Sequence, residues 1–301
     1  MKSEVFMYNA LTIDVEDYFH VTAFERYVKI EDWDCFPLRV VANTHRILDL
    51  LEEFSVKATF FVLGWVAQRV PGLVREIMQR GHEIACHGYC HELVYAIGPE
   101  RFRKDVRRAK GLLEDITGVP VCGYRAPSYS ITGKSLWALD ILVEEGFTYD
   151  SSIFPIVHDI YGIPGGERFP HEIETRAGKI NEFPISTFPL RIGWWHYRLP
   201  IAGGGYLRLF PAPLVGRAIN YINTCESQPT VVYFHPWEID PDQPRIRAGL
   251  KSRFRHYLNL NKMESKIKYL LNSLKFHAIQ DVWNLSGNRI ERTSNEMSMS
   301  R

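Results

Sequence analysis

The stretch Ala58–Cys86 reads ATFFVLGWVAQRVPGLVREIMQRGHEIAC and decides the fold class. Residues 58–63 are mostly β-branched or aromatic and are followed by a glycine, which is typical of a buried strand. Over residues 66–80 the apolar side chains recur at helical spacing, and Gly81 stands where a glycine commonly ends a helix. Residues 83–86 form a second short strand. A strand, a helix and a strand in this order predict a βαβ unit with parallel strands.

The same alternation continues on both sides of this unit. Further strands are predicted at residues 9–14, 121–124, 147–150 and 230–234, and near 278–279. Helices are predicted over residues 40–54, 99–117, 133–145 and 260–275. The fold class is therefore α/β, with a parallel sheet that is open or closed into a barrel. Residues from about 155 to 210 are rich in Pro, Gly and aromatics, which predicts a loop-rich insertion with short antiparallel strands over one end of the sheet.

The bulk composition is that of one ordinary globular protein. Hydrophobic residues make up 46% and charged residues 24% of the 301 residues. No compositional break marks a linker, so we expect a single domain over residues 1–285, with a C-terminal extension from about residue 240. Residues 286–301 are polar and are expected to form a disordered tail. The net charge of +1 argues against a nucleic-acid binder.

The sequence also indicates a cellular compartment. It contains neither a run of about 18 apolar residues nor the apolar core of a secretory signal, so we expect no membrane span and a cytoplasmic protein. The 5 cysteines are an odd number at irregular spacing, which favours reduced thiols. A basic stretch favours a solvated helix face, with a peripheral contact to lipid head groups or an anionic polymer as the alternative. Its cations are Arg245, Arg247, Lys251, Arg253 and Arg255.

Five polar residues stand at, or just after, the ends of predicted strands. They are Asp14, His87, Arg125, Asp150 and His235. In parallel α/β barrels the C-terminal ends of the strands meet at one face, where active sites are built. We therefore expect these side chains to lie close together.

Two histidines and a run of carboxylates predict a metal site. His87 and His91 are four residues apart, so a helical turn would point both rings in one direction. The run Asp14-Val15-Glu16-Asp17 places three carboxylates after the first strand. Taken alone, the histidine pair favours two surface histidines, and the acidic run favours a solvated turn or a helix N-cap. Combined, they fit an open site of two histidines and one carboxylate.

The other motifs have structural alternatives as well. Arg125 is also typical of a strand-end salt bridge, and His235 of a satisfied core histidine. Cys86 and Cys90 flank His87, which raises a structural Cys/His zinc site as an alternative. Cys86 is expected to point inward, and no second cysteine pair completes four ligands, so this alternative is disfavoured.

Taken together and in this order, the motifs resemble the polysaccharide deacetylases of carbohydrate esterase family 4, the NodB-homology fold. The resemblance runs from Asp14 to about Trp237 and rests on the acidic strand end, His-x-x-x-His, Arg-x-Pro, Tyr-Asp-Ser-Ser and Phe-His-Pro-Trp. Residues 12–19, 182–186, 203–206 and 234–240 resemble the subgroup associated with bacterial exopolysaccharide loci. The resemblance implies a distorted (β/α)7 barrel with a loop-rich insertion and a helical C-terminal extension. It also implies a divalent metal, Zn²⁺ before other transition metals.

The resemblance implies a role for each matching residue. Asp14 corresponds to the general base, Arg125 to the arginine that orients this base, and His235 to the general acid that protonates the leaving amine. His87 and His91 correspond to the metal-binding pair.

Two further roles and the third metal ligand are less closely matched. The backbone N–H of Ser128 corresponds to the oxyanion donor, and Asp150 to the acid that tunes the catalytic histidine. Most of the family has two adjacent aspartates, whereas here Glu16 and Asp17 follow Asp14 at the second and third positions. Alternation along an extended chain favours Glu16 as the metal ligand, and a turn after Asp14 favours Asp17. Both stay open.

The resemblance implies hydrolysis of N-acetyl groups on an amino-sugar glycan with release of acetate. The substrate would be an exopolysaccharide or its lipid-linked precursor. Aromatic residues in and after the insertion are candidate platforms for sugar rings, and these are Trp194, Trp195, Tyr206 and Trp237. Two other functions are compatible with the motifs: an amidohydrolase of the same fold that acts on a small cyclic amide, and a glycan-binding protein without catalysis.

Overall fold

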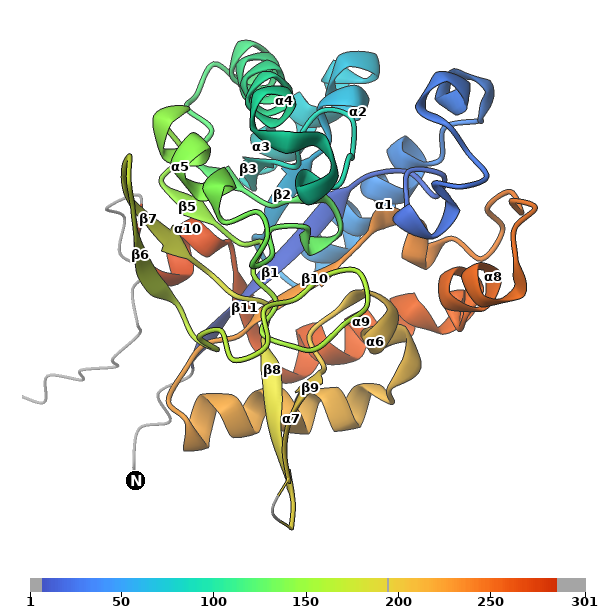
Figure 1. The fold of residues 1–301 in the computed structure, drawn as a ribbon. Coiled ribbons are helices and arrows are strands. Elements are labelled where there is room, and N and C mark those ends of the chain that lie inside the picture. The colour runs from blue at the N-terminus through green and yellow to red at the C-terminus, as the bar shows by residue number, and fades with distance from the viewer. Residues whose placement is uncertain (1–6, 194, 286–301) are drawn as a thin grey trace, which may run out of the picture.

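A computed structural model describes residues 7–193 and 195–285, so the predicted disordered tail lies outside the described residues. One large sheet forms the centre, with helices packed around it (Figure 1). Its strand order is β10-β1-β2-β3-β4-β5-β7-β6, and β11 also pairs with β1. The bounds are β1 (Tyr8–Val15), β2 (Thr59–Val62), β3 (Glu83–Cys86), β4 (Gly123–Tyr124), β5 (Tyr149–Asp150), β6 (His171–Thr175), β7 (Gly178–Glu182), β10 (Val231–Phe234) and β11 (Lys275–His277). Only β6 and β7 pair antiparallel in this sheet, so the predicted α/β class is confirmed.

The sheet curls until its two edges approach each other. Just after β7, the N–H of Ser186 donates to the carbonyl of Val231 in β10 at 3.4 Å. The N–H of Val231 donates in return to Ser186 Oγ at 2.8 Å. A parallel bridge also joins Gly203 to Tyr233. Single-residue contacts rather than a full ladder join the edges, so the sheet forms the distorted, incomplete barrel that was predicted.

Helices cover the outside of this barrel. Their bounds are α1 (Val40–Glu53), α2 (Gly64–Arg69), α3 (Pro71–Gln79), α4 (Val94–Thr117), α5 (Trp137–Glu144), α7 (Ala212–Cys225), α9 (Leu260–Ser273) and α10 (Ile279–Val282). The single helix predicted over 66–80 is two helices, because Pro71 has no N–H to donate and begins a new one. The helix predicted from residue 99 begins earlier, at Val94, and is interrupted at Gly98, where φ is 73°. Within the described ranges, no helix has both the length and the apolar character needed to cross a membrane.

The segment predicted as an insertion contains two antiparallel hairpins. One is β6–β7, and the other is β8 (Thr187–Ile192) with β9 (Trp195–Pro200), which projects from the body of the molecule (Figure 1). Strand β7 also pairs with β5, so part of this segment continues the central sheet. The C-terminal extension includes α8 (Leu250–Tyr257), and it is not helical throughout, because its strand β11 pairs with β1.

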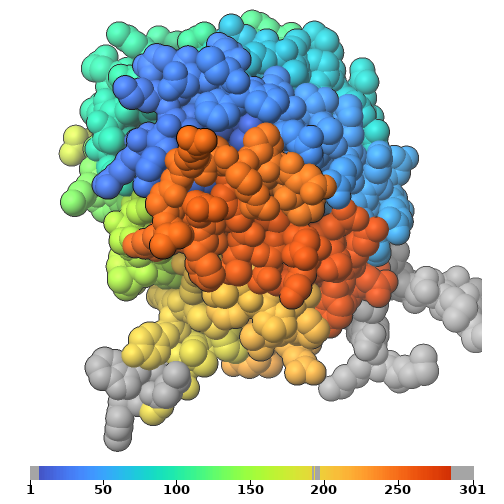
Figure 2. Space-filling view, turned by 90° about the vertical axis from the view of Figure 1, so that its right-hand side faces the viewer, coloured from blue at the N-terminus to red at the C-terminus, as the bar shows by residue number. Residues whose placement is uncertain are grey.

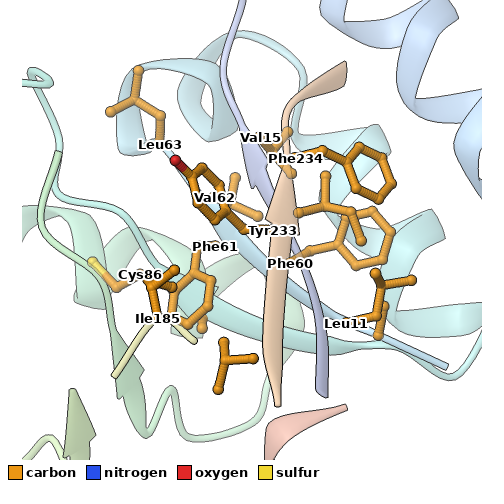
Figure 3. Close-up of a cluster of buried hydrophobic side chains, with 14 of the residues drawn as sticks. Leu11, Val15, Phe60, Phe61, Val62, Leu63, Cys86, Ile185, Tyr233 and Phe234 are labelled. Carbon is orange, nitrogen blue, oxygen red and sulfur yellow. The ribbon is translucent and has the colours of Figure 1, made fainter. Parts of the chain in front are cut away.

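The alternation of side chains along β2 identifies the inside of the barrel. Figure 3 shows Phe60 and Phe61 on opposite sides of this strand, as expected for neighbouring residues in a sheet. Phe61 is in register with Asp14 of β1, and Phe60 is in register with Ile13. The guanidinium carbon of Arg125, from beyond β4, lies 4.0 Å from the ring centroid of Phe61. Asp14 therefore points into the barrel at the C-terminal end of β1.

Glu83, at the start of β3, couples the stability of the fold to pH. Its buried carboxyl group accepts hydrogen bonds from Thr59 Oγ1 at 2.5 Å, Tyr149 Oη at 2.7 Å and the N–H of Gln280 at 3.2 Å. Burial is the largest effect, and it raises the pKa of Glu83 from 4.5 to about 7 despite these bonds. The folded protein thus keeps a proton that the unfolded chain releases. The resulting stabilisation is complete below the unfolded pKa and is lost as the pH rises through the folded pKa.

We expect Glu83→Gln to remove this pH dependence, because the amide stays uncharged. Between pH 4.5 and about pH 7, the free energy of unfolding of the wild type should fall relative to the variant by about 3 kcal/mol. Denaturant titrations at a series of pH values measure this difference. A difference that is the same at every pH would contradict the account.

Candidate active site

The C-terminal ends of β1, β3, β4 and β10 meet at a pocket of about 390 Å³. Its walls include most of the residues singled out in the sequence, namely Asp14, Glu16, His87, His91, Ser128, Tyr206, His235 and Trp237. These residues come from segments more than 200 positions apart in the chain. The parallel sheet brings them to one face of the barrel, as expected for strand ends in this fold class.

A buried ion pair lies at the base of this pocket. Arg125 Nη1 donates to Asp14 Oδ1 at 2.7 Å and to Thr12 Oγ1 at 2.7 Å. Its Nη2 donates to Ser151 Oγ at 2.9 Å, and its Nε to the Ser151 carbonyl at 3.1 Å. Burial alone would lower the pKa of Arg125, but the charge and hydrogen bond of Asp14, together with the nearby Tyr129 and Tyr233, raise it. Asp14 is thus held in position by a guanidinium group that is itself fixed by its hydrogen bonds to Thr12 and Ser151.

Glu16, His87 and His91 form the group best suited to a metal ion. One ligand atom from each lies within 4.8 Å of the other two. His87 Nδ1 lies 2.8 Å from the carbonyl of Arg125, which can only accept, so Nδ1 carries the proton and Nε2 is free. Burial lowers the pKa of His87 to about 4, which keeps the ring neutral, as a metal ligand must be.

Glu16 is the carboxylate of this group. Its Oε2 lies 2.6 Å from His91 Nε2, and its Oε1 accepts a hydrogen bond from Trp237 Nε1 at 3.2 Å. Burial raises the pKa of Glu16, but the pairing with His91 and the other nearby histidines outweighs burial and lowers it below the usual range. Glu16 is therefore ionised, and its carboxylate is oriented to bind a positively charged group.

Asp17, the other candidate ligand, points elsewhere. Its Oδ1 accepts from the N–H of Tyr18 at 2.9 Å. Its Oδ2 accepts from the N–H groups of Arg39 at 2.7 Å and Val40 at 2.9 Å, at the start of α1. Both oxygens of Asp17 accept hydrogen bonds from backbone N–H groups, and neither belongs to the group formed by Glu16, His87 and His91.

The helical turn considered for residues 87–91 is not present. This segment is a loop in which Gly88 has φ 71° and His91 has φ 53°. The carboxylate of Asp105, from α4, accepts the N–H of Tyr89 at 2.7 Å and the N–H of Cys90 at 3.0 Å. A side chain from a neighbouring helix, rather than local helix geometry, therefore orients the two histidines.

His235 follows β10 and pairs with a carboxylate that the sequence reading missed. Its Nδ1 lies 2.7 Å from Glu238 Oε1, and Arg208 Nε donates to Glu238 Oε2 at 2.6 Å. The other ring nitrogen, Nε2, lies 3.9 Å from Asp14 Oδ2 and 3.6 Å from Glu16 Oε1. Burial alone would lower the pKa of His235, but the bond to Glu238 and the nearby carboxylates raise it to about 9.

The described hydrogen bonds of Asp150 do not include His235, and the acid that pairs with this histidine is Glu238. Asp150 Oδ1 instead accepts from Ser152 Oγ at 2.5 Å. Burial raises the pKa of Asp150 to about 6, and burial together with Asp150 raises the pKa of Glu182 well above its ordinary value. The spacing of His235 and Glu238 within one turn was a signal that could have been read from the sequence.

The pocket walls contain some of the predicted substrate-binding groups. Ser128 lies in the 3₁₀ turn η3 (Pro127–Tyr129) with φ 50° and lines the pocket, as does Tyr206. Trp237 is only 4% exposed, and its ring stacks on the imidazoles of His235 and His256, so it does not offer a free face to a sugar.

The remaining predicted platforms are in the β8–β9 hairpin. Trp194 lies outside the described residues, and the backbone of Trp195 begins β9 at the tip of the hairpin.

A structural zinc site built on cysteines receives no support from the described part of the chain. Cys86 is buried and belongs to no group of metal-ligand atoms there. Cys90 lies near Glu92 and Asp105, but the carboxylate of Asp105 is already used by backbone N–H groups.

Comparison with known proteins divides the chain into two matched regions. Residues 32–145 match the family model described as polysaccharide deacetylase, and residues 151–284 match one described as a domain of unknown function, DUF3473. The peptidoglycan deacetylase-like protein FGM2 of Gibberella zeae is 31% identical over 130 residues, which are 42% of this chain and 37% of that protein. A peptidoglycan-N-acetylglucosamine deacetylase of Bacillus cereus is 33% identical over 98 residues, 32% of this chain and 36% of that protein. The matches thus span little more than a third of these relatives.

A similar fold is found among solved structures. The crystal structure of a candidate polysaccharide deacetylase from Mycobacterium smegmatis aligns with a TM-score of 0.54 and 23% identity. The alignment covers 87% of this chain and 89% of that one, so the two share a fold over nearly their whole length. Residues 32–145 therefore match the polysaccharide deacetylase family and its relatives, and the solved structure shares the fold of most of the chain.

Proposed function

We propose that this chain removes N-acetyl groups from an amino-sugar glycan by divalent-metal-dependent hydrolysis. The observation that carries the proposal is the convergence, in one pocket, of three metal-ligand side chains with a carboxylate–arginine pair and a histidine–carboxylate pair. The relatives named for peptidoglycan and N-acetylglucosamine support an N-acetylated glycan as the substrate class. An exopolysaccharide or its lipid-linked precursor is the specific substrate proposed, because the sequence motifs resemble that subgroup.

The residues of the pocket fit a divalent metal ion, and Zn²⁺ is the ion we propose. Glu16, His87 and His91 would hold it, as one carboxylate and two imidazoles that leave positions open for water and substrate. Glu16 Oε2 is buried and, in the described part of the protein, has no partner besides the facing His91 Nε2 at 2.6 Å, so a bound cation would satisfy this oxygen. When bound, the ion would polarise the amide carbonyl and lower the pKa of a water molecule.

Asp14 is placed to act as the general base. One of its oxygens is held by Arg125, and the other lies 3.9 Å from His235 Nε2. Asp14 takes a proton from the attacking water as the water oxygen bonds to the acetyl carbon. The backbone N–H of Ser128, at the pocket wall, donates to the acetyl oxygen as negative charge develops there.

His235 is placed to act as the general acid. Glu238 holds its Nδ1, which directs Nε2 toward Asp14 and Glu16. As the amide C–N bond breaks, His235 gives its Nε2 proton to the amine nitrogen, and acetate leaves. Arg208 fixes Glu238 from its other oxygen, so Glu238 acts through His235 as a positioning residue.

The activity itself is tested by acetate release from N-acetylglucosamine oligosaccharides. We expect the Zn²⁺-loaded protein to release acetate and to leave free amino groups on the glycan. His87→Ala, or removal of the metal with a chelator, should lower the rate by at least about 100-fold, because the amide is then no longer polarised.

His45→Ala is the matched control for that experiment. His45 is a partly exposed histidine that pairs with Glu76 and does not line the pocket, so its loss should leave acetate release unchanged. Full activity of the His87→Ala protein, or of the metal-free protein, would contradict the proposal. Binding of the oligosaccharide without any release would instead support a glycan-binding protein.

The choice between Glu16 and Asp17 is tested by metal content. Glu16→Gln should lower bound Zn²⁺ at a given free concentration by about tenfold or more, because an amide is a poor substitute for a carboxylate ligand. Asp17→Asn should keep the metal but lower the free energy of unfolding by about 1–3 kcal/mol, because Asp17 caps backbone N–H groups. Metal analysis and denaturant titration measure the two effects. The reverse pattern would show that Asp17 is the ligand.

The role of Glu238 is tested by comparison with Asp150. Glu238→Gln should lower kcat by roughly 10- to 100-fold with little change in KM, because His235 is no longer oriented by a carboxylate. Asp150→Asn should keep kcat near that of the wild type, because Asp150 pairs away from His235. If Asp150→Asn lowers kcat and Glu238→Gln does not, the assignment is wrong.

A further inference from the structure

The most exposed large apolar side chains among the described residues gather at one place. They are Val157 at 84%, Leu250 at 82% and Phe254 at 65% exposure. Asp159, two residues after Val157, lies 3.8 Å from Lys251 and 3.9 Å from Arg255, so the two segments are neighbours. Single exposed apolar residues are common on protein surfaces, but a group of nearly bare ones indicates a surface that is covered in use.

The exposure on α8 is not the result of a loosely held helix. His256 is buried, stacks on Trp237 at 4.1 Å between centroids and bonds to Gln243 Oε1 at 2.7 Å. The hydroxyl of Tyr257 accepts the N–H of Ile246 at 2.8 Å. One side of α8 is therefore anchored to the barrel. Leu250 and Phe254 are four residues apart, so they share the opposite, solvent side.

The same region carries a concentration of positive charge. From Gln243 to Met263 the sequence contains no Asp or Glu. Its cations are Arg245, Arg247, Lys251, Arg253, Arg255 and Lys262. Figure 2 shows the orange segment that includes α8 on the surface facing the viewer, beside the blue N-terminal segment. Apolar side chains among Lys and Arg, on a helix that lies on the surface, are typical of a contact with anionic lipids.

We propose that this surface, formed by Val157 and the outer side of α8, binds an anionic lipid bilayer. We call it the docking face. Leu250, Phe254 and Val157 enter the head-group region, and the flanking cations interact with lipid phosphates. A soluble polyanion would account for the cations but gives no reason for nearly bare apolar side chains.

The docking face adjoins the mouth of the candidate active site. Phe254 and Arg255 also line the pocket, together with His158 and Ile160 from the segment after Val157. Docking would therefore turn the pocket mouth toward the bilayer surface. One consequence rests on the proposed function: the substrate would be a glycan carried at a membrane rather than free in solution.

Vesicle co-sedimentation of the full chain tests the docking face. We expect binding to vesicles of phosphatidylglycerol and phosphatidylcholine, and little binding to phosphatidylcholine alone. Lys251→Gln with Arg253→Gln should lower the partition coefficient by roughly 30-fold, and added salt should weaken the binding of the wild type. Val157→Ser with Leu250→Ser should lower it by roughly tenfold.

Leu214→Ser with Tyr221→Ser is the matched apolar control. These residues of α7 are 49% and 43% exposed and do not line the pocket, so this change should leave vesicle binding unaltered. Failure to bind anionic vesicles, or equal losses in the control, would overturn the proposal. The proposal would also be overturned, in favour of a polyanion site, by two results together. These are binding to dextran sulfate, and vesicle binding that is unchanged by Val157→Ser with Leu250→Ser. The assay contains no glycan, so its result is independent of deacetylase activity.

Discussion

Arg125 reaches from the end of β4 through the inside of the barrel, and its side chain is completely buried. It donates to Asp14 and Thr12 of β1 and to Ser151 beyond β5. An unpaired guanidinium at this depth would be strongly unfavourable, so the strand ends that supply its acceptors must stay together. The carbonyl of Arg125 also accepts a hydrogen bond from His87 Nδ1. One residue thus orients both the proposed base and a proposed metal ligand.

The candidate site is assembled from three parts of the chain. Asp14, in β1, and Glu16, just after it, precede the region that matches the polysaccharide deacetylase model, and the histidine pair and Arg125 lie within that region. His235 belongs to the region that matches the domain of unknown function. The indole N–H of Trp237 donates to Glu16, which connects the third part to the first. Under the proposed function, the region that matches the domain of unknown function would supply the general acid, His235.

The sequence predicts the strands, and with them the residues at strand ends, because both depend on local patterns. It does not choose between Glu16 and Asp17, because the choice depends on the start of α1, where backbone N–H groups bind Asp17. It misses Arg208, whose partner Glu238 lies thirty positions away, as expected for a contact made by the tertiary fold. The helix break at Pro71 follows from proline chemistry, so it could be predicted from the sequence alone.

The proposed function requires a divalent metal ion between the end of β1 and the loop after β3. Anomalous diffraction at the zinc absorption edge, from crystals grown with Zn²⁺, would locate this ion. We expect a peak at about 2.0–2.2 Å from a carboxylate oxygen of Glu16 and from one ring nitrogen each of His87 and His91. A peak at the Cys90, Glu92 and Asp105 group instead, or no peak in the pocket at saturating Zn²⁺, would contradict the account.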